Sequence, residues 1–218
     1  EQDISDLALP LDQATFGSLD PSSPFTGMAV SLAHTGTFNF GGPGYVGFTQ
    51  RGPLYAGLLA GAFLAFGESV WVVFFINTLL LWVTIFLLWR ISVRCLPGRW
   101  SLLPSLLLAI FWEISVFVSF GIYELLALCA ATCFVWCFLH YYDTQKIAWL
   151  AGASLAIGAL ILEKPIVLYS IPFFALWIVM WQWTCIPWRT LTAHAFLFMM
   201  LASMGAGIWS WRNHRVLD

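Results

Sequence analysis

Six stretches of the chain are apolar over roughly the length that a helix needs to cross a lipid bilayer. They cover residues 69–89, 101–123, 125–142, 147–162, 166–183 and 190–211. About 20 predominantly apolar residues span the hydrocarbon core, and the fourth stretch is the shortest. Charged residues make up 9% of the chain, compared with about 25% in a typical soluble domain. The sequence therefore predicts an all-α polytopic membrane protein with about six transmembrane helices.

The distribution of basic residues predicts which helix ends face the cytoplasm. The loop RISVRCLPGR between the first two stretches contains Arg90, Arg94 and Arg99, and cytoplasmic loops carry an excess of such residues. Because successive helices alternate in direction, residues 140–146 and 182–189 are predicted to lie inside as well. We expect an integral protein of a bacterial inner membrane or a plasma membrane, with its N-terminal loop and C-terminal tail outside.

Three predicted domains follow from this topology. Residues 1–68 form an outer (periplasmic or extracellular) loop, residues 69–211 a transmembrane helical domain, and residues 212–218 an outer tail. Within the loop, the thirteen apolar or small residues 54–66 are too few to span a membrane, and runs of 10–14 such residues are more often interfacial. Residues 25–35 are a second, weaker candidate. The loop is therefore expected to carry two membrane-surface helices.

Ionisable residues at membrane depth are expensive, and by default they indicate function. Glu124 opens the third apolar stretch at its outer end, where it acts either as a functional acid or as a helix cap favoured by the helix dipole. Glu113 lies in mid-helix and could pair with a neighbour. Glu163 and Lys164 form either a local ion pair or a ligand contact, because the next residue is a helix-breaking proline. His194 fits a hydrogen-bonded, buried histidine better than a ligand.

Cations on the outer segments run against the usual charge bias of membrane proteins. These residues are Arg51, Lys164, Arg212 and Arg215. An anionic lipid head group with a phosphate or pyrophosphate would make them useful through charge-assisted hydrogen bonds. The alternative is that each side chain extends separately to the phosphates of the outer leaflet.

Two other classes of function are disfavoured by the sequence. The formal net charge is −2, and there is no basic run or RNA-binding motif, so no nucleic-acid partner is expected. Cys129, Cys133 and Cys137 share one helix face but have no histidine or carboxylate partners at ligand spacing. We interpret them as small apolar residues in a helix contact and predict no dedicated metal site.

The order of short motifs from about residue 20 onward resembles a known family. The motifs are AVSLAHTGTF, RGPLYAGLLAGAFLAFG, RISVRCLPGR, SFGIYELL, LAGASLAIGALILEKP and WSWRNHRVLD. Their order and spacing are similar to the N-terminal half of the GT-C glycosyltransferases that use polyprenyl-phosphate sugars, such as protein O-mannosyltransferases and the lipid A aminoarabinose transferase. Family members carry further helices after this half, so the resemblance predicts either a fragment of a longer enzyme or a truncated relative.

The resemblance also implies roles for particular residues. Glu124 matches the second family acid, and Asp20 corresponds to the first, although it stands five residues before an aromatic residue instead of four. Arg51 matches the basic residue that holds the donor phosphate, and Arg212 matches the arginine of the family's RN turn. Together with Lys164, these two arginines are the expected phosphate-binding residues.

Two functions remain open at this point. The first is an inverting glycosyltransferase in which Asp20 or Glu124 is the general base on an acceptor hydroxyl, with a polyprenyl-phosphate-linked sugar as donor. A divalent metal ion is compatible with two nearby acids. The alternative is a non-catalytic subunit that packs against membrane protein partners through small-residue faces such as Gly152, Ser154 and Gly158. A transporter ranks third because no inverted repeat is visible.

Overall fold

The computed structural model describes residues 24–38, 52–111, 113–114, 118, 123–183 and 186–217. These residues form eight α-helices and two short 3-10 helices, which confirms the predicted all-α class. The α-helices are α2 (Pro24–Thr35), α3 (Leu54–Phe66), α4 (Val70–Cys95), α5 (Leu103–Ile110), α7 (Glu124–Thr144), α8 (Ile147–Glu163), α9 (Ile171–Gln182) and α10 (Trp188–Leu217). The 3-10 helices η3 (Gly98–Leu102) and η4 (Pro165–Ser170) precede α5 and α9.

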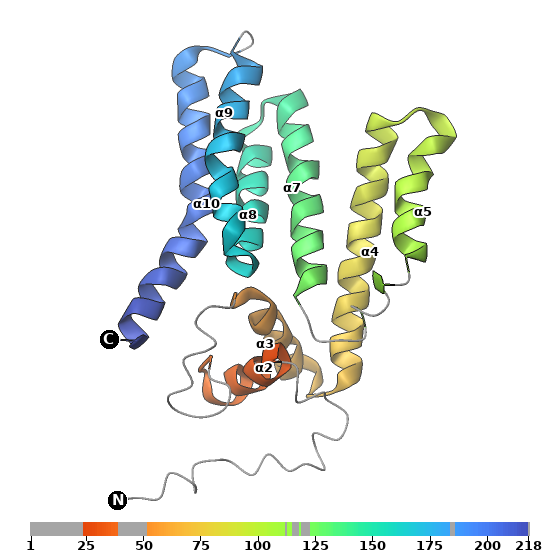
Figure 1. The fold of residues 1–218 in the computed structure, drawn as a ribbon, viewed down its shortest axis with the longest axis vertical. Helices are drawn as coiled ribbons and strands as arrows, with labels where there is room; N and C mark the ends of the chain where they lie inside the picture. Colours follow the sequence, from red (N-terminus) through yellow and green to blue (C-terminus); the bar gives the residue numbers. More distant parts are fainter. Residues whose placement is uncertain are drawn as a thin grey trace, which may run out of the picture.

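The helices from α4 to α10 run roughly alongside one another (Figure 1). Four described segments are long and apolar enough to cross a membrane: Val70–Cys95, Glu124–Thr144, Pro165–Gln182 and Trp188–Arg215. Large apolar side chains point outward from them; Trp71, for example, is 76% exposed. An apolar exterior of this kind is suited to lipid. The segments Gly98–Ile110 and Ile147–Glu163 are shorter, so their crossing of the membrane stays a prediction.

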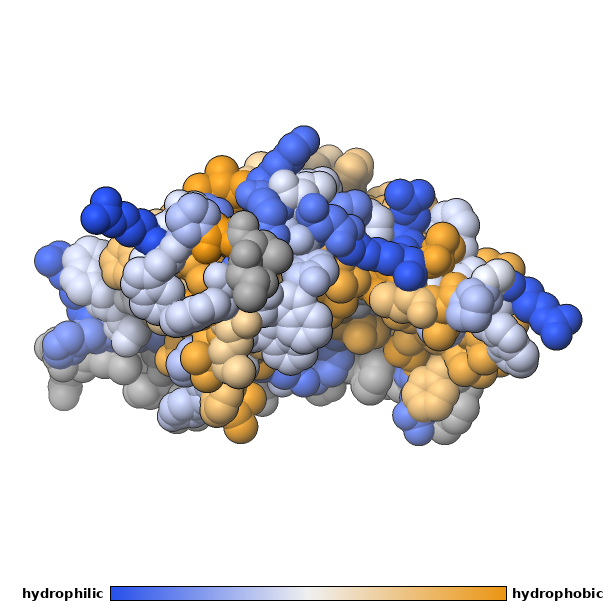
Figure 2. Space-filling model, turned by 90° about the horizontal axis from the view of Figure 1, so that it is seen from above, coloured by the Kyte–Doolittle hydropathy of each residue, from blue (hydrophilic) through white to orange (hydrophobic). Residues whose placement is uncertain are grey.

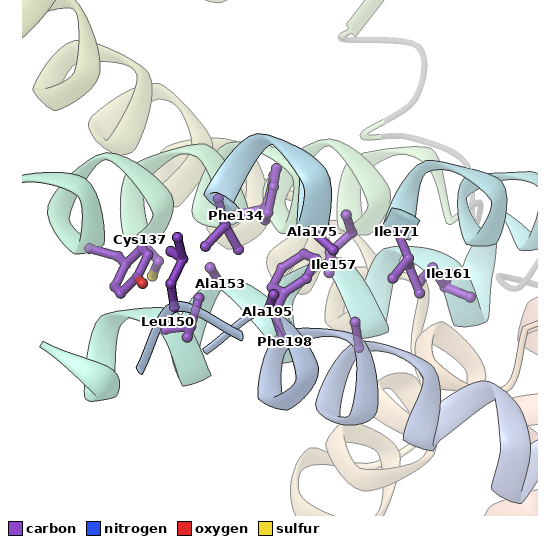
Figure 3. Packing of buried hydrophobic residues seen from close by; sticks show 14 residues of the cluster. Phe134, Cys137, Leu150, Ala153, Ile157, Ile161, Ile171, Ala175, Ala195 and Phe198 are labelled. Atoms are coloured by element: carbon purple, nitrogen blue, oxygen red, sulfur yellow. The ribbon is translucent and has the colours of Figure 1, made fainter. Parts of the chain in front are cut away.

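Helices α7, α8, α9 and α10 pack around one apolar core (Figure 3), and glycines of α8 allow the closest approaches to α7 and α10. A Cβ atom at Gly158 of α8 would lie 3.1 Å from the carbonyl oxygen of Ala202 in α10. A Cβ atom at Gly152 would lie 3.2 Å from the sulfur of Cys137, which is buried in this core. Close backbone approach at small residues is the usual way in which membrane helices pack. Cys137 therefore packs as a small apolar side chain, in agreement with the interpretation of its sequence.

Helices α2 and α3 lie together across one end of the other helices (Figure 1). Helix α3 has the predicted bounds of 54–66, and α2 begins one residue before the predicted 25–35. Helix α3 ends at Gly67, whose positive φ of 83° suits a glycine at a helix C-cap. Its outward side carries apolar residues, among them Leu64, which is 72% exposed. We retain the prediction that this helix lies on the membrane surface.

The turns that were predicted to share one side do lie at the same end of the molecule, opposite α2 and α3 (Figure 1). Arg94 in the last turn of α4 forms an ion pair with Asp143 at the end of α7. Figure 2 looks onto this end and shows hydrophilic side chains spread over it. The alternation of the helices is therefore as predicted. Which end faces the cytoplasm remains a prediction.

Thiol labelling tests this orientation directly. In a cysteine-free background, a cysteine at Thr37, which follows α2, should react with an impermeant maleimide added outside intact cells. A cysteine at Thr144, at the opposite end, should react only after permeabilisation, because the arginine-rich loop packs at that end. Both positions are exposed, so accessibility within the fold is matched. The reverse pattern would contradict the assignment of the two faces.

Candidate functional site

A pocket lined by one acidic and one basic residue lies at the end of the helices that α2 and α3 cover. Its volume is about 320 Å³, at the small end of the range for ligand sites in proteins. It is lined by Ile114, Glu124, Leu125, Ala127, Leu128, Leu160 and Lys164. Glu124 and Lys164 are therefore brought together, whereas the rest of the lining is apolar. Such a site can take an amphiphile with a charged head group.

Glu124 is placed in the pocket by the start of α7, of which it is the first residue. A carboxylate at this position is stabilised by the helix dipole. Its Oε2 atom is inaccessible to solvent and accepts no hydrogen bond from the described residues. The start of α7 therefore holds the Glu124 carboxylate in the lining of the pocket.

Lys164 enters the pocket because α8 stops directly before it. Pro165 lacks a backbone N–H and disfavours helical geometry in the residue before it, and Lys164 accordingly leaves the helix with φ −130° and ψ 86°. Its Nζ atom lies 5.4 Å from the centroid of the Tyr123 ring, within the range of a cation–π contact. Because Tyr123 precedes Glu124, this contact holds the ammonium group beside the start of α7.

Glu163 has a role that was not predicted from the sequence. It is only 5% exposed, and its Oε1 atom accepts a 2.7 Å hydrogen bond from the backbone N–H of Tyr55, in the first turn of α3. Glu163 thus caps the start of α3 instead of forming the local ion pair with Lys164 that was one of the two predicted alternatives. A cap that is supplied from 108 residues away leaves no local sequence signal.

Tyr55 joins α3 to two further elements. Its side chain is fully buried, and its hydroxyl donates a 2.8 Å hydrogen bond to Oδ1 of Asn77 in α4. Asn77 in turn donates to the carbonyl oxygen of Val118 at 3.1 Å. Burial raises the pKa of the Tyr55 hydroxyl above its usual range, so this group stays neutral and remains a donor. The start of α3 is therefore fixed by its backbone and by its side chain.

Replacing Tyr55 by phenylalanine should lower the free energy of unfolding by about 1–3 kcal/mol, because Asn77 loses a buried donor. Thermal unfolding in detergent measures this change. Tyr169→Phe is the matched control, since Tyr169 is 75% exposed and its replacement should have little effect. Equal melting temperatures for the Tyr55→Phe protein and the wild type would show that the Tyr55–Asn77 hydrogen bond does not stabilise the fold.

Arg212 lies apart from the residues that line the pocket. Its guanidinium carbon is 4.8 Å from the ring centroid of Trp209 and 5.5 Å from that of Phe38, which follows α2. It thus joins the end of α10 to the segment after α2. Asp20 and Arg51 lie outside the described residues, so their predicted roles stay untested.

His194 and Glu113, two other ionisable residues singled out in the sequence, are not among the residues that line this pocket. His194 accepts or donates a 2.8 Å hydrogen bond with the Tyr141 hydroxyl, which fits the predicted hydrogen-bonded histidine. Glu113 is exposed. In the part of the chain that the structure describes, no three His, Cys, Asp or Glu side chains form a group that could hold a metal ion. Asp20, one of the two acids with which a divalent ion is compatible, lies outside that part.

The fold is that of a helical membrane protein, and its pocket places a carboxylate and an ammonium group together at one end of the helices. The family model for dolichyl-phosphate-mannose-protein mannosyltransferases matches residues 50–209. The chain belongs to this family, which confirms the resemblance seen in the sequence. Comparison with curated proteins and with solved structures gives no match. The matched range includes α3 and both charged residues of the pocket.

Proposed function

We propose that this protein is an inverting glycosyltransferase, which transfers a sugar from a polyprenyl-phosphate donor to an acceptor hydroxyl at the outer face of the membrane. Membership of the family supports the donor class. The observation that carries the proposal is the pocket in which Glu124 and Lys164 stand beside an apolar wall. That combination suits a lipid-linked phosphate, whose head group is charged and whose chain is apolar.

In the proposed reaction, the acceptor oxygen attacks the anomeric carbon of the sugar. The new carbon–oxygen bond forms as the bond to the phosphate oxygen breaks, so the configuration inverts. Glu124 takes the proton of the acceptor hydroxyl, as a general base does. The polyprenyl phosphate leaves with the bonding electron pair. Lys164 stabilises the negative charge that develops on it, an electrostatic contribution that is often the largest in enzymes.

Three further residues are assigned to this site by the family resemblance alone. Asp20 is proposed as the second catalytic acid, and Arg51 and Arg212 as additional ligands of the donor phosphate. The Arg212 guanidinium packs against Phe38 and Trp209. The outer-face location rests on the arginines at the opposite end of the helices.

The release of dolichyl phosphate from dolichyl-phosphate mannose tests this proposal. The full chain in lipid nanodiscs is incubated with radiolabelled donor and a panel of serine- and threonine-containing peptides. We expect donor binding and time-dependent release of dolichyl phosphate. A protein that binds no donor and instead copurifies in fixed ratio with another membrane protein would contradict the enzyme and favour the alternative of a non-catalytic subunit.

A further inference from the structure

We infer that Glu163 is a positioning residue that holds the start of α3 beside the junction carrying Lys164. The inference rests on the proposed function, because it assigns a role in arranging the same donor site. It does not make Glu163 a general base or a phosphate ligand. Two contacts between the start of α3 and the end of α8 lie at this junction.

The first contact is the hydrogen bond from the Tyr55 N–H to Glu163 Oε1. The first N–H groups of a helix have no partner within the helix. Pro53, which stands at the N-cap of α3, provides no side-chain hydrogen bond. Glu163 supplies the missing acceptor from α8. The end of α8 and the start of α3 are therefore linked by a buried hydrogen bond.

The second contact is made by the backbone just before α3. Gly52 is buried, and a Cβ atom at this position would overlap the carbonyl oxygen of Leu162, the residue before Glu163. Any side chain larger than hydrogen would thus push the segment away from α8. The close approach of Gly52 lets the Glu163 carboxylate reach the first turn of α3.

Both contacts involve residues that directly precede Lys164 in the sequence, and Lys164 lines the pocket. A shift of α3 away from α8 would therefore change the surroundings of Lys164. Displacements of about 1 Å at a reacting site can cost two orders of magnitude in rate. A residue that fixes this junction consequently controls donor binding without touching the donor.

The test compares Glu163→Ala with Glu163→Gln in the full chain. Gln keeps an oxygen that can accept the Tyr55 N–H, whereas Ala removes it. Two quantities are measured in nanodiscs: hydrogen exchange of the amides of residues 54–58, and the dissociation constant for dolichyl-phosphate mannose. For Glu163→Ala we expect faster exchange and binding weakened by about 10-fold or more. Glu163→Gln should stay within about 3-fold of the wild type in both quantities.

Ser69→Ala is the matched control for the loss of a helix cap. Ser69 caps α4 by accepting a hydrogen bond from the Trp71 N–H, so its replacement should lower the melting temperature and leave donor binding unchanged. Should the Glu163→Ala protein fail to fold, Glu163→Asp, whose carboxylate is one methylene shorter, is measured instead, with the same direction of change expected.

Three results would overturn the inference: unchanged exchange of residues 54–58 in Glu163→Ala, equal weakening of binding in Ser69→Ala, or equal damage in Glu163→Gln. Absence of donor binding in the wild type would contradict the proposed function instead. In that case, the exchange measurement still decides whether Glu163 holds α3.

Discussion

Replacing Glu124 by glutamine should slow sugar transfer by roughly 100- to 10,000-fold, the usual contribution of a general base. Glutamine keeps the size of the side chain and most of its hydrogen-bonding capacity, but it cannot take the proton of the acceptor hydroxyl. The Oε2 atom of Glu124 accepts no hydrogen bond from the described residues, so the substitution breaks no described hydrogen bond of that atom. The measurement is the initial rate of transfer from dolichyl-phosphate mannose at saturating donor.

The alternative for Glu124 is a purely structural role at the start of α7. In that case, the same substitution should cost about 1 kcal/mol of stability or less and leave the transfer rate intact. Glu113→Gln is the matched control, because Glu113 is an exposed carboxylate outside the pocket. A Glu124→Gln protein with the rate of the wild type would remove Glu124 from the mechanism.

Replacing Lys164 by glutamine should lower kcat/KM for the donor by about 100- to 1,000-fold, the effect of removing one group that stabilises developing negative charge. Arginine at the same position keeps the positive charge and should restore part of the activity. The effect should appear in donor binding as well as in kcat, because the leaving phosphate is charged before and after transfer. Competition by dolichyl phosphate alone measures the binding part.

Lys146 provides the control for the Lys164 experiment. It is the other lysine of the chain and lies exposed in the turn between α7 and α8, at the far end of the molecule. Lys146→Gln should leave donor binding and transfer unchanged. If both lysine substitutions weaken donor binding equally, the effect reflects the overall charge of the protein, and Lys164 has no special place in the site.

Local patterns were sufficient to predict most of the fold. The thirteen-residue run 54–66 became α3 with the predicted bounds because Pro53 and Gly67 limit a helix on both sides. The break after α8 was predictable from Pro165, and it brings Lys164 out of the helix. The charge pattern also predicted which turns share an end, as the Arg94–Asp143 pair shows.

Contacts between distant parts of the chain could not be predicted in this way. The sequence singled out Glu163 as an unusual charge, but the donor of its hydrogen bond, the Tyr55 N–H, lies in α3. The buried link from Tyr55 to Asn77 likewise depends on how α3 packs against α4. The two residues of each pair lie in different helices, so no regular spacing of residues in the sequence indicates their contact. The meeting of Glu124 and Lys164 is visible only once α7 and α8 are packed.

The pocket of Glu124 and Lys164 is proposed to hold the phosphate of a lipid-linked sugar donor. A cryo-electron microscopy structure of the full chain in nanodiscs with dolichyl-phosphate mannose would locate this phosphate. We expect density for a phosphate within about 4 Å of Lys164 Nζ, the range of a charge-assisted contact, with the sugar directed toward Glu124. A donor phosphate bound elsewhere, with the pocket filled by protein side chains or left without ligand density, would contradict it.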